Sequence, residues 1–200
     1  WQSVAQRADA RAALERFLAY HQRADRRLVG TEISVRTELE VPTPDGGVEQ
    51  VRLTGFIDRV EIDSAGRAVA IDLKNMKSPP KAADIPEHGQ LGVYQLLLRD
   101  GAWLPDHSDE PDEAEPVPVG VGGAALVQLR TPESSKDPAA KVQFQESLPA
   151  EEPTWVEVKL GQAAAILRSE QFDAVPGSAC NYCVLRTSCP AQAVGKTVVP

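Results

Sequence analysis

Asp58, Asp72 and Lys74 have the residue types and the spacing needed for metal-assisted chemistry. All three lie in the stretch TGFIDRVEIDSAGRAVAIDLKN (54–75), which alternates in the manner of two β-strands joined by a tight turn. Because side chains alternate with period two along a strand, Asp72 and Lys74 share one face of the second strand. Asp58 falls on a largely apolar face of the first strand, where a carboxylate is costly unless it is paired or bound to a cation.

The turn between the two strands decides whether the aspartates meet. A three-residue loop at 64–66 puts Gly66 where a left-handed residue is needed, which is a common hairpin solution. Asp58 then lies directly opposite Asp72, with Cβ atoms about 4.5–5.5 Å apart. A four-residue loop would send the two carboxylates to opposite faces. We favour the three-residue loop.

Two carboxylates at this separation repel each other, so one pKa rises unless a divalent cation lies between them. Lys74 could then orient a water molecule or stabilise negative charge forming on a phosphate. The alternative is an ordinary ion pair of Asp58 or Asp72 with a neighbouring lysine or arginine, because Asp-x-Lys is a common tripeptide. The spacing alone leaves both interpretations open.

The elements that would position these residues predict a mixed α/β domain. Helical periodicity is predicted over 6–25, 83–100 and 154–172, and strand alternation over 31–41, 50–63, 67–75, 122–131 and 141–148. We divide the chain into a core at 1–175 and a cysteine-rich tail at 176–200.

Composition sets the broad class of the protein. Two hundred residues can bury the core of one domain. No apolar run approaches the roughly 20 residues that span a bilayer, and the three cysteines do not form a disulfide framework, so we expect a cytoplasmic protein with no membrane partner. The net charge of −8 is concentrated in an acidic insertion at about 105–118, which leaves the remainder nearly balanced. The only methionine is internal, so we expect a piece of a longer polypeptide.

The three cysteines are gathered near the end of the chain, in CNYCVLRTSCP (180–190). Cys180, Cys183 and Cys189 have the spacing C-x₂-C-x₅-C. A closed tetrahedral thiolate site needs four ligands, so one is missing. On these residues alone a partial zinc site is one interpretation, and the fourth ligand would lie upstream of the chain.

Three ordered motifs resemble the RecB-type branch of the PD-(D/E)xK nucleases: G-x-x-D-R on one strand, D-x-K on the next, and Q-x-x-x-Y on a helix. By this resemblance Asp58 and Asp72 are the metal-binding aspartates, Lys74 is the catalytic lysine, and the backbone carbonyl of Leu73 is a further metal ligand. The implied cofactor is Mg²⁺ or Mn²⁺. The implied fold is a restriction-endonuclease-like mixed β-sheet core flanked by helices, with the cysteine-rich, cluster-binding segment at its C-terminal end.

The helix motif of the same resemblance falls on Gln90 and Tyr94. Their i, i+4 spacing puts both side chains on one side of the helix, facing the substrate or the active site. The resemblance implies that they bind and position substrate. His88, beside Gln90, is not counted as a DNA contact.

The resemblance is closest to the nuclease domains that end UvrD/Rep-type helicase–nucleases such as AddAB and AdnAB. It implies an exonuclease-type DNA hydrolase in double-strand-break resection, with DNA, a parent helicase and a heterodimer partner subunit. In AddB-type members a tail of this spacing binds an iron–sulfur cluster together with one distant cysteine. By this resemblance Cys180, Cys183 and Cys189 hold a [4Fe–4S] cluster whose fourth cysteine lies outside this chain, in preference to zinc.

Two other functions remain as alternatives: a non-catalytic DNA-binding module of such a complex, and a zinc-stabilised interaction domain. Two residues that could match further family positions are given no role. His21 lies in the opening helix without a surrounding motif, and Glu32 is interpreted as strand-surface charge.

Overall fold

The computed structural model describes residues 2–23, 25–100 and 120–194. The helices and strands are α1 (Gln2–Arg23), β1 (Arg27–Pro42), β2 (Val48–Ile62), β3 (Ala68–Lys74), α2 (Gly89–Arg99), β4 (Val121–Pro132), β5 (Ala140–Gln145) and α3 (Trp155–Ser169), with short 3₁₀ helices η1 (Ala82–Asp84) and η2 (Ser178–Tyr182). The predicted acidic insertion lies outside the described residues.

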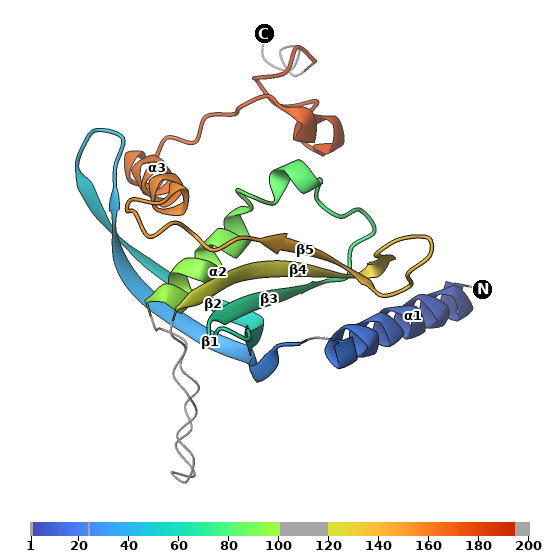
Figure 1. The fold of residues 1–200 in the computed structure, drawn as a ribbon. Coiled ribbons are helices and arrows are strands. Elements are labelled where there is room, and N and C mark those ends of the chain that lie inside the picture. Colours follow the sequence, from blue (N-terminus) through green and yellow to red (C-terminus); the bar gives the residue numbers. More distant parts are fainter. Residues whose placement is uncertain (1, 24, 101–119, 195–200) are drawn as a thin grey trace.

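The strands form a single five-stranded sheet in the order β1-β2-β3-β4-β5. Neighbouring strands are antiparallel except for β3 and β4, which run parallel. A parallel pair needs a crossover connection, and α2 lies in it. Figure 1 shows α1 and α2 on opposite faces of the sheet. The prediction of a mixed sheet flanked by helices is therefore confirmed.

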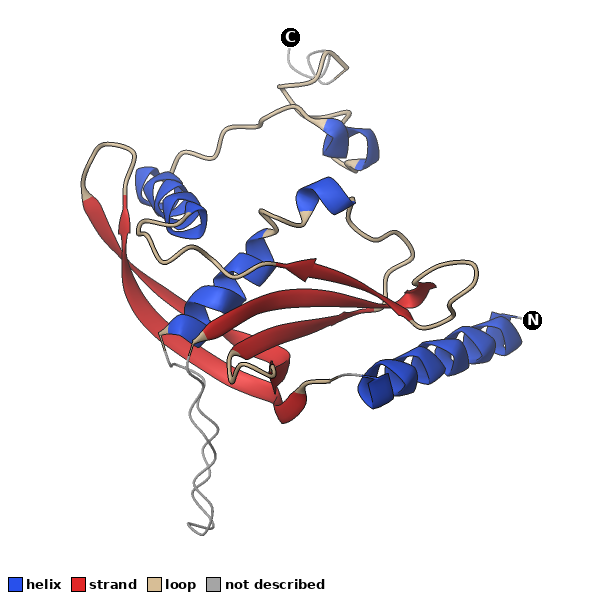
Figure 2. Ribbon diagram, viewed as in Figure 1, coloured by secondary structure: helices blue, strands red, loops and turns tan. Residues whose placement is uncertain are grey.

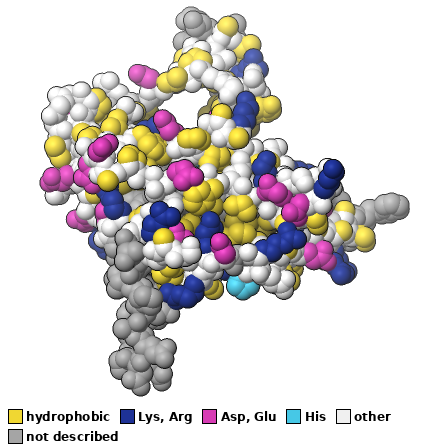
Figure 3. Space-filling model, in the orientation of Figure 1, with side chains coloured by type: hydrophobic (Ala, Val, Ile, Leu, Met, Phe, Trp, Pro, Cys, Tyr) yellow, Lys and Arg dark blue, Asp and Glu magenta, His cyan; other side chains and the backbone are white. Residues whose placement is uncertain are grey.

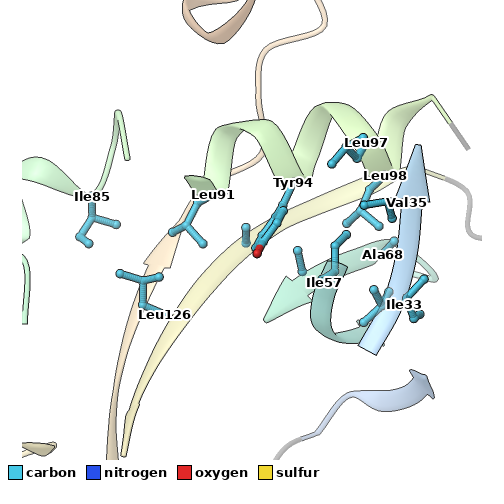
Figure 4. Packing of buried hydrophobic residues seen from close by; sticks show 13 residues of the cluster. Ile33, Val35, Ile57, Ala68, Ile85, Leu91, Tyr94, Leu97, Leu98 and Leu126 are labelled. Atoms are coloured by element: carbon cyan, nitrogen blue, oxygen red, sulfur yellow. The ribbon is translucent and has the colours of Figure 1, made fainter. Parts of the chain in front are cut away.

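Strand β3 divides the core into two layers because its residues alternate. Ala68 and Ala70 pack in the layer beneath α2, whereas Val69 and Ile71 pack in the layer facing α1. The small alanines leave room for the side chains of α2, and Figure 4 shows Tyr94 reaching from that helix toward the sheet. Asp72 and Lys74 continue the face of the alanines, so β3 presents them on the α2 side.

Two glycines let α3 pack closely on its neighbours. A Cβ added to Gly161 would lie 1.8 Å from the carbonyl oxygen of Pro42 in β1, and one added to Gly92 would lie 2.5 Å from Val156. Side chains at these positions would force the elements apart. Helix α3 thereby packs against both α2 and the long β1–β2 hairpin.

Helix α2 begins at Gly89, within the helical segment predicted at 83–100 and shortly after Pro86. The side-chain amide of Gln145 in β5 donates hydrogen bonds to the carbonyls of Ile85 and His88, at 2.8 and 3.3 Å. These bonds occupy backbone acceptors of the preceding segment, and His88 is extended rather than helical. A residue from a distant strand therefore holds the segment just before the helix.

No helix within the described ranges is both long enough and apolar enough to cross a membrane.

Candidate active site

The β2–β3 hairpin has the predicted register. Arg59 pairs with Ile71, and the three following pairs keep the same offset around a turn in which Gly66 has φ 79°. The ladder ends at Arg59, and there a side chain replaces the backbone: Asp58 Oδ2 accepts a hydrogen bond from the N–H of Leu73 at 2.8 Å. The three-residue loop is confirmed, and Asp58 is held against the strand that carries Asp72.

A connected polar network surrounds Asp72, which is only 2% exposed. Lys74 Nζ lies 2.7 Å from Asp72 Oδ2 and donates to Gln90 Oε1 at 2.9 Å. Gln90 Nε2 donates to Asp72 Oδ1 and to the hydroxyl of Tyr94, both at 2.8 Å. The D-x-K pair of β3 and the Q-x-x-x-Y pair of α2 therefore form one constellation.

One oxygen of this network has no aligned hydrogen-bond donor. Asp72 Oδ2 is buried without a hydrogen bond, because the nearby Lys74 ammonium meets it at an unfavourable angle. This oxygen is ion-paired with Lys74 and keeps lone-pair capacity that a further ligand could use. The oxygen chemistry of Asp58, Asp72 and the carbonyl of Leu73 suits a divalent cation such as Mg²⁺, which binds through one or two carboxylates and keeps several waters.

The charges of both carboxylates affect the pKa of the Tyr94 phenol. Burial raises the pKa of Tyr94, the hydrogen bond from Gln90 lowers it, and the charges of Asp72 and Asp58 raise it further, so the net shift is upward. The hydroxyl therefore stays protonated at neutral pH, and it lies 3.5 Å from Asp72 Oδ1 as a weak donor.

His88, which caps the start of α2, borders this network. Burial lowers its pKa, the nearby Lys74 lowers it further, and Asp72 partly offsets these effects. Its Nδ1 is buried and has no hydrogen-bond partner. The imidazole is therefore neutral at physiological pH and lies near Lys74, a position that the local sequence did not reveal.

His21 lies on the other side of the sheet. Its Nδ1 is 3.0 Å from Arg59 Nη2, and Arg59 in turn donates to the fully buried Glu61 at 2.5 Å. Tyr20 also donates to Glu61, at 3.0 Å, and packs in the core layer facing α1. This network attaches α1 to the sheet, and it places His21 away from Asp72.

Glu32 has a place that its local sequence does not indicate. Its neighbours Thr31 and Ile33 pair with Arg59 and Ile57, so Glu32 lies opposite Asp58 in the β1–β2 register. It adopts φ 51°, a left-handed conformation that is unfavourable for a non-glycine residue. Such strain is often found beside functional groups. The position of Glu32 beside Asp58 could have been predicted only from the register of β1 against β2, not from the pattern of β1 alone.

The three cysteines of the tail lie within the described residues, but their side chains do not form a metal site there. Cys180 and Cys189 are half-buried, Cys183 is exposed, and all three thiols are free. No group of three or more His, Cys, Asp or Glu side chains arranged to hold a metal occurs in the described part of the chain. Figure 2 shows this segment as loops and one short helix beyond α3. The cluster therefore stays a prediction.

The fold is a mixed sheet flanked by helices. Strand β3 carries the D-x-K pair, and its hairpin partner β2 carries Asp58. This arrangement is consistent with the restriction-endonuclease-like fold. Residues 1–190 match the family described as the PD-(D/E)XK nuclease superfamily. This match covers nearly the whole sequence, and the chain belongs to that superfamily. Its members are typically metal-dependent nucleases.

Comparison with other proteins adds little beyond this membership. No curated protein matches the sequence. Twelve chains of solved structures match, among them the crystal structure of SSO0001, which is 19% identical with a TM-score of 0.47. That match covers 90% of this chain and 68% of SSO0001.

Proposed function

We propose that this chain is a metal-dependent DNA nuclease domain. Asp58, Asp72 and the backbone carbonyl of Leu73 would hold Mg²⁺ or Mn²⁺, and Lys74 would act on the reacting phosphate. The observation that carries this proposal is that one polar network joins the nearly buried Asp72 to Lys74 and Gln90, with Asp58 held on the adjacent strand by the N–H of Leu73.

The residues of the chain have separate tasks in this proposal. A bound divalent cation supplies Lewis-acid activation of the phosphate and of an attacking water. Lys74 supplies a positive charge for the developing negative charge, and its bond to Gln90 keeps the ammonium at the site when its contact with Asp72 is given up. Asp58 is fixed by the N–H of Leu73, so that only its other oxygen remains free of this bond.

Gln90 and Tyr94 are assigned a positioning role. The amide of Gln90 contacts both Asp72 and Lys74, so it fixes the distance between the carboxylate and the ammonium. Tyr94 holds the amide in turn, at 2.8 Å. Gln90 is also exposed, which leaves it at the surface that a substrate would approach. The predicted substrate contact and this positioning role are compatible.

The proposal extends to the context of the domain. We place it in a helicase–nuclease that resects DNA ends in the cytoplasm, with exonuclease-type action, a parent helicase and a heterodimer partner. The support is the order of the three motifs and the C-x₂-C-x₅-C tail, whose free thiols would bind a [4Fe–4S] cluster with a cysteine from outside this chain. In this proposal the role of the cluster is structural, tying the tail to an upstream part of the polypeptide.

Cleavage of linear single- and double-stranded DNA tests the proposal. The chain, and a version extended upstream, would be assayed with Mn²⁺ and with chelator. Lys74→Met should reduce metal-dependent cleavage by at least about 100-fold, because one charge-stabilising group is lost. Lys136→Met, on an exposed loop, is the matched control. Cutting that survives Lys74→Met would refute this site, and DNA binding without any cutting would favour the non-catalytic module. Iron and sulfide analysis of the extended chain separates the cluster from zinc.

A further inference from the structure

A group of charged side chains lines a cavity at the end of the sheet. The cavity has a volume of about 250 Å³ and is lined by Asp9, Ala12 and Arg16 of α1, Lys77 after β3, and Arg130 of β4. This is far more than the roughly 30 Å³ that one liquid water molecule occupies. Three cations and one carboxylate leave the lining positively charged, in a chain whose net charge is −8.

The arginines of the cavity are held in place and still have donors to offer. Arg16 Nη1 donates to the backbone carbonyl of Leu129 at 3.0 Å, which fixes the guanidinium. Its Nε is buried and has no hydrogen-bond partner. Arg130 is paired with Asp9, whose side chain is 60% exposed and can turn toward solvent. Because Arg16 Nε is not accessible to solvent, the donors that an anion in the cavity could meet are the remaining guanidinium N–H groups of Arg16 and those of Arg130.

Lys77 is the third cation, and its ammonium is available. The residue is exposed, and within the described ranges its side chain takes part in no hydrogen bond or ion pair. Figure 3 shows that acidic and basic side chains are interspersed over one face of the molecule. The cavity differs from this mixed surface because its lining has more cations than carboxylates.

The cavity lies at the same end of the sheet as Lys74. Lys77 follows Lys74 by three residues, so their Cα atoms are at most about 11 Å apart. Lys74 pairs with Gln128 across β3 and β4, and Arg130 is two residues further along the same strand. Figure 1 shows α1 extending beneath the end of the sheet where β4 stops. The cavity lies against α1, whereas β3 presents Asp72 and Lys74 on the α2 side, so a strand of nucleic acid that contacts both must pass around this end of the sheet.

We propose that the cavity binds a backbone phosphate of the DNA strand that is cut at the Asp72 site. The proposal rests on the proposed nuclease function and adds a substrate-binding subsite to it. Guanidinium groups offer phosphate paired donors in a fixed geometry, and lysine adds a point charge. Contacts of this kind fix the register of a nucleic acid without reading its sequence. Arg16 and Arg130 are the anchoring groups, and Lys77 guides the strand from the site.

A double substitution tests the subsite by binding. Lys77→Gln with Arg130→Gln removes two positive charges from the cavity. The matched control, Lys136→Gln with Arg168→Gln, removes two from exposed positions elsewhere, and Arg168, like Arg130, has an acidic partner, Glu49. Affinity for a labelled single-stranded oligonucleotide would be measured by anisotropy in chelator, which prevents cutting. The cavity variant should bind roughly tenfold or more weakly, with a salt slope shallower by about 0.7 per lost phosphate. Equal affinity of the two variants would overturn the proposal.

A scan of neutral methylphosphonate linkages shows whether one phosphate is held. Neutralising one particular linkage should weaken binding to the parent chain but not to the cavity variant, because the two changes remove the same contact. An identical penalty in both proteins would overturn the subsite. Lys77→Gln alone disturbs no contact of the fold and should give part of the loss. If the parent chain neither binds nor cuts DNA, the nuclease function falls too; if it cuts and only the scan fails, the subsite alone is refuted.

Discussion

Replacing Asp72 with asparagine tests the metal site without any DNA. Asparagine keeps the shape of the side chain, and its oxygen can still accept the hydrogen bond that Gln90 donates at 2.8 Å. Its amide group, however, would replace the oxygen that lies 2.7 Å from Lys74 Nζ. Two donors then face each other where an ion pair stood, so the variant should be less stable than the parent even without metal.

The size of this loss follows from the burial of the pair. The side chain of Asp72 is 3% exposed and that of Lys74 is 25% exposed. Exposed ion pairs contribute up to about 1 kcal/mol, and breaking a fully buried one costs about 3–5 kcal/mol. We expect an intermediate loss of about 2 kcal/mol, which lowers Tm by about 4–8 °C in a chain of this length.

Divalent cation then separates a metal site from an ion pair. At a Mn²⁺ concentration tenfold above its Kd, the parent chain should gain about 1.4 kcal/mol, or about 3–6 °C in Tm. Asp72→Asn should gain less than about 1 °C at the same concentration, because one of two carboxylate ligands is gone. Asp173→Asn, at an exposed position after α3, is the control and should respond like the parent. Equal Mn²⁺ shifts for Asp72→Asn and the parent in thermal melts would refute the assignment of the site.

Gly161→Ala would place a Cβ 1.8 Å from the carbonyl oxygen of Pro42, so α3 must move and urea unfolding should show a loss of at least about 2 kcal/mol; an unchanged midpoint would contradict the packing. Acidification below about pH 6.5 should destabilise the chain through His88, because its folded pKa lies below the unfolded value and the unfolded imidazole takes up its proton first. His88→Gln should flatten this part of the pH dependence in chemical denaturation, and an unaltered slope would exclude His88 as its source. Glu32→Gly should be more stable than Glu32→Ala by about 1–2 kcal/mol, since glycine adopts φ 51° without strain; equal stability of the two in urea would show that this backbone is not strained.

The hairpin that carries the aspartates could be predicted because its determinants are local. Gly66 selects the turn, the turn selects the register, and the register places Asp58 against β3. The contacts that hold the segment before α2 could not be predicted in this way, because Gln145 comes from a strand far along the sequence. Glu32 has its meaning only from the strand opposite it, which a single-strand pattern does not contain.

The helix motif was predictable in its spacing but not in its partners. Positions 90 and 94 share one helix face whatever the fold. That the amide of Gln90 joins Asp72 to Lys74 depends on how α2 crosses β3, and the two alanines of β3 allow that approach only in the folded sheet. Helix periodicity contains no information on that crossing.

The D-x-K constellation and the cavity beside α1 differ in how far apart in the chain their contacts lie, and this has a consequence for the order of folding. The hydrogen bonds that Asp58 and Asp72 accept from Leu73, Gln90 and Tyr94 join positions 15 to 22 apart, whereas the contacts of Arg16 and Arg130 join positions 113 and 121 apart. Each doubling of a closed loop costs about 0.6 kcal/mol in entropy, so closing the longer loops costs about 1.5 kcal/mol more. The D-x-K constellation can therefore form within a short, early unit of the fold, while the phosphate cavity exists only after α1 has docked on a completed sheet. Detachment of α1 would remove the cavity and leave that unit standing.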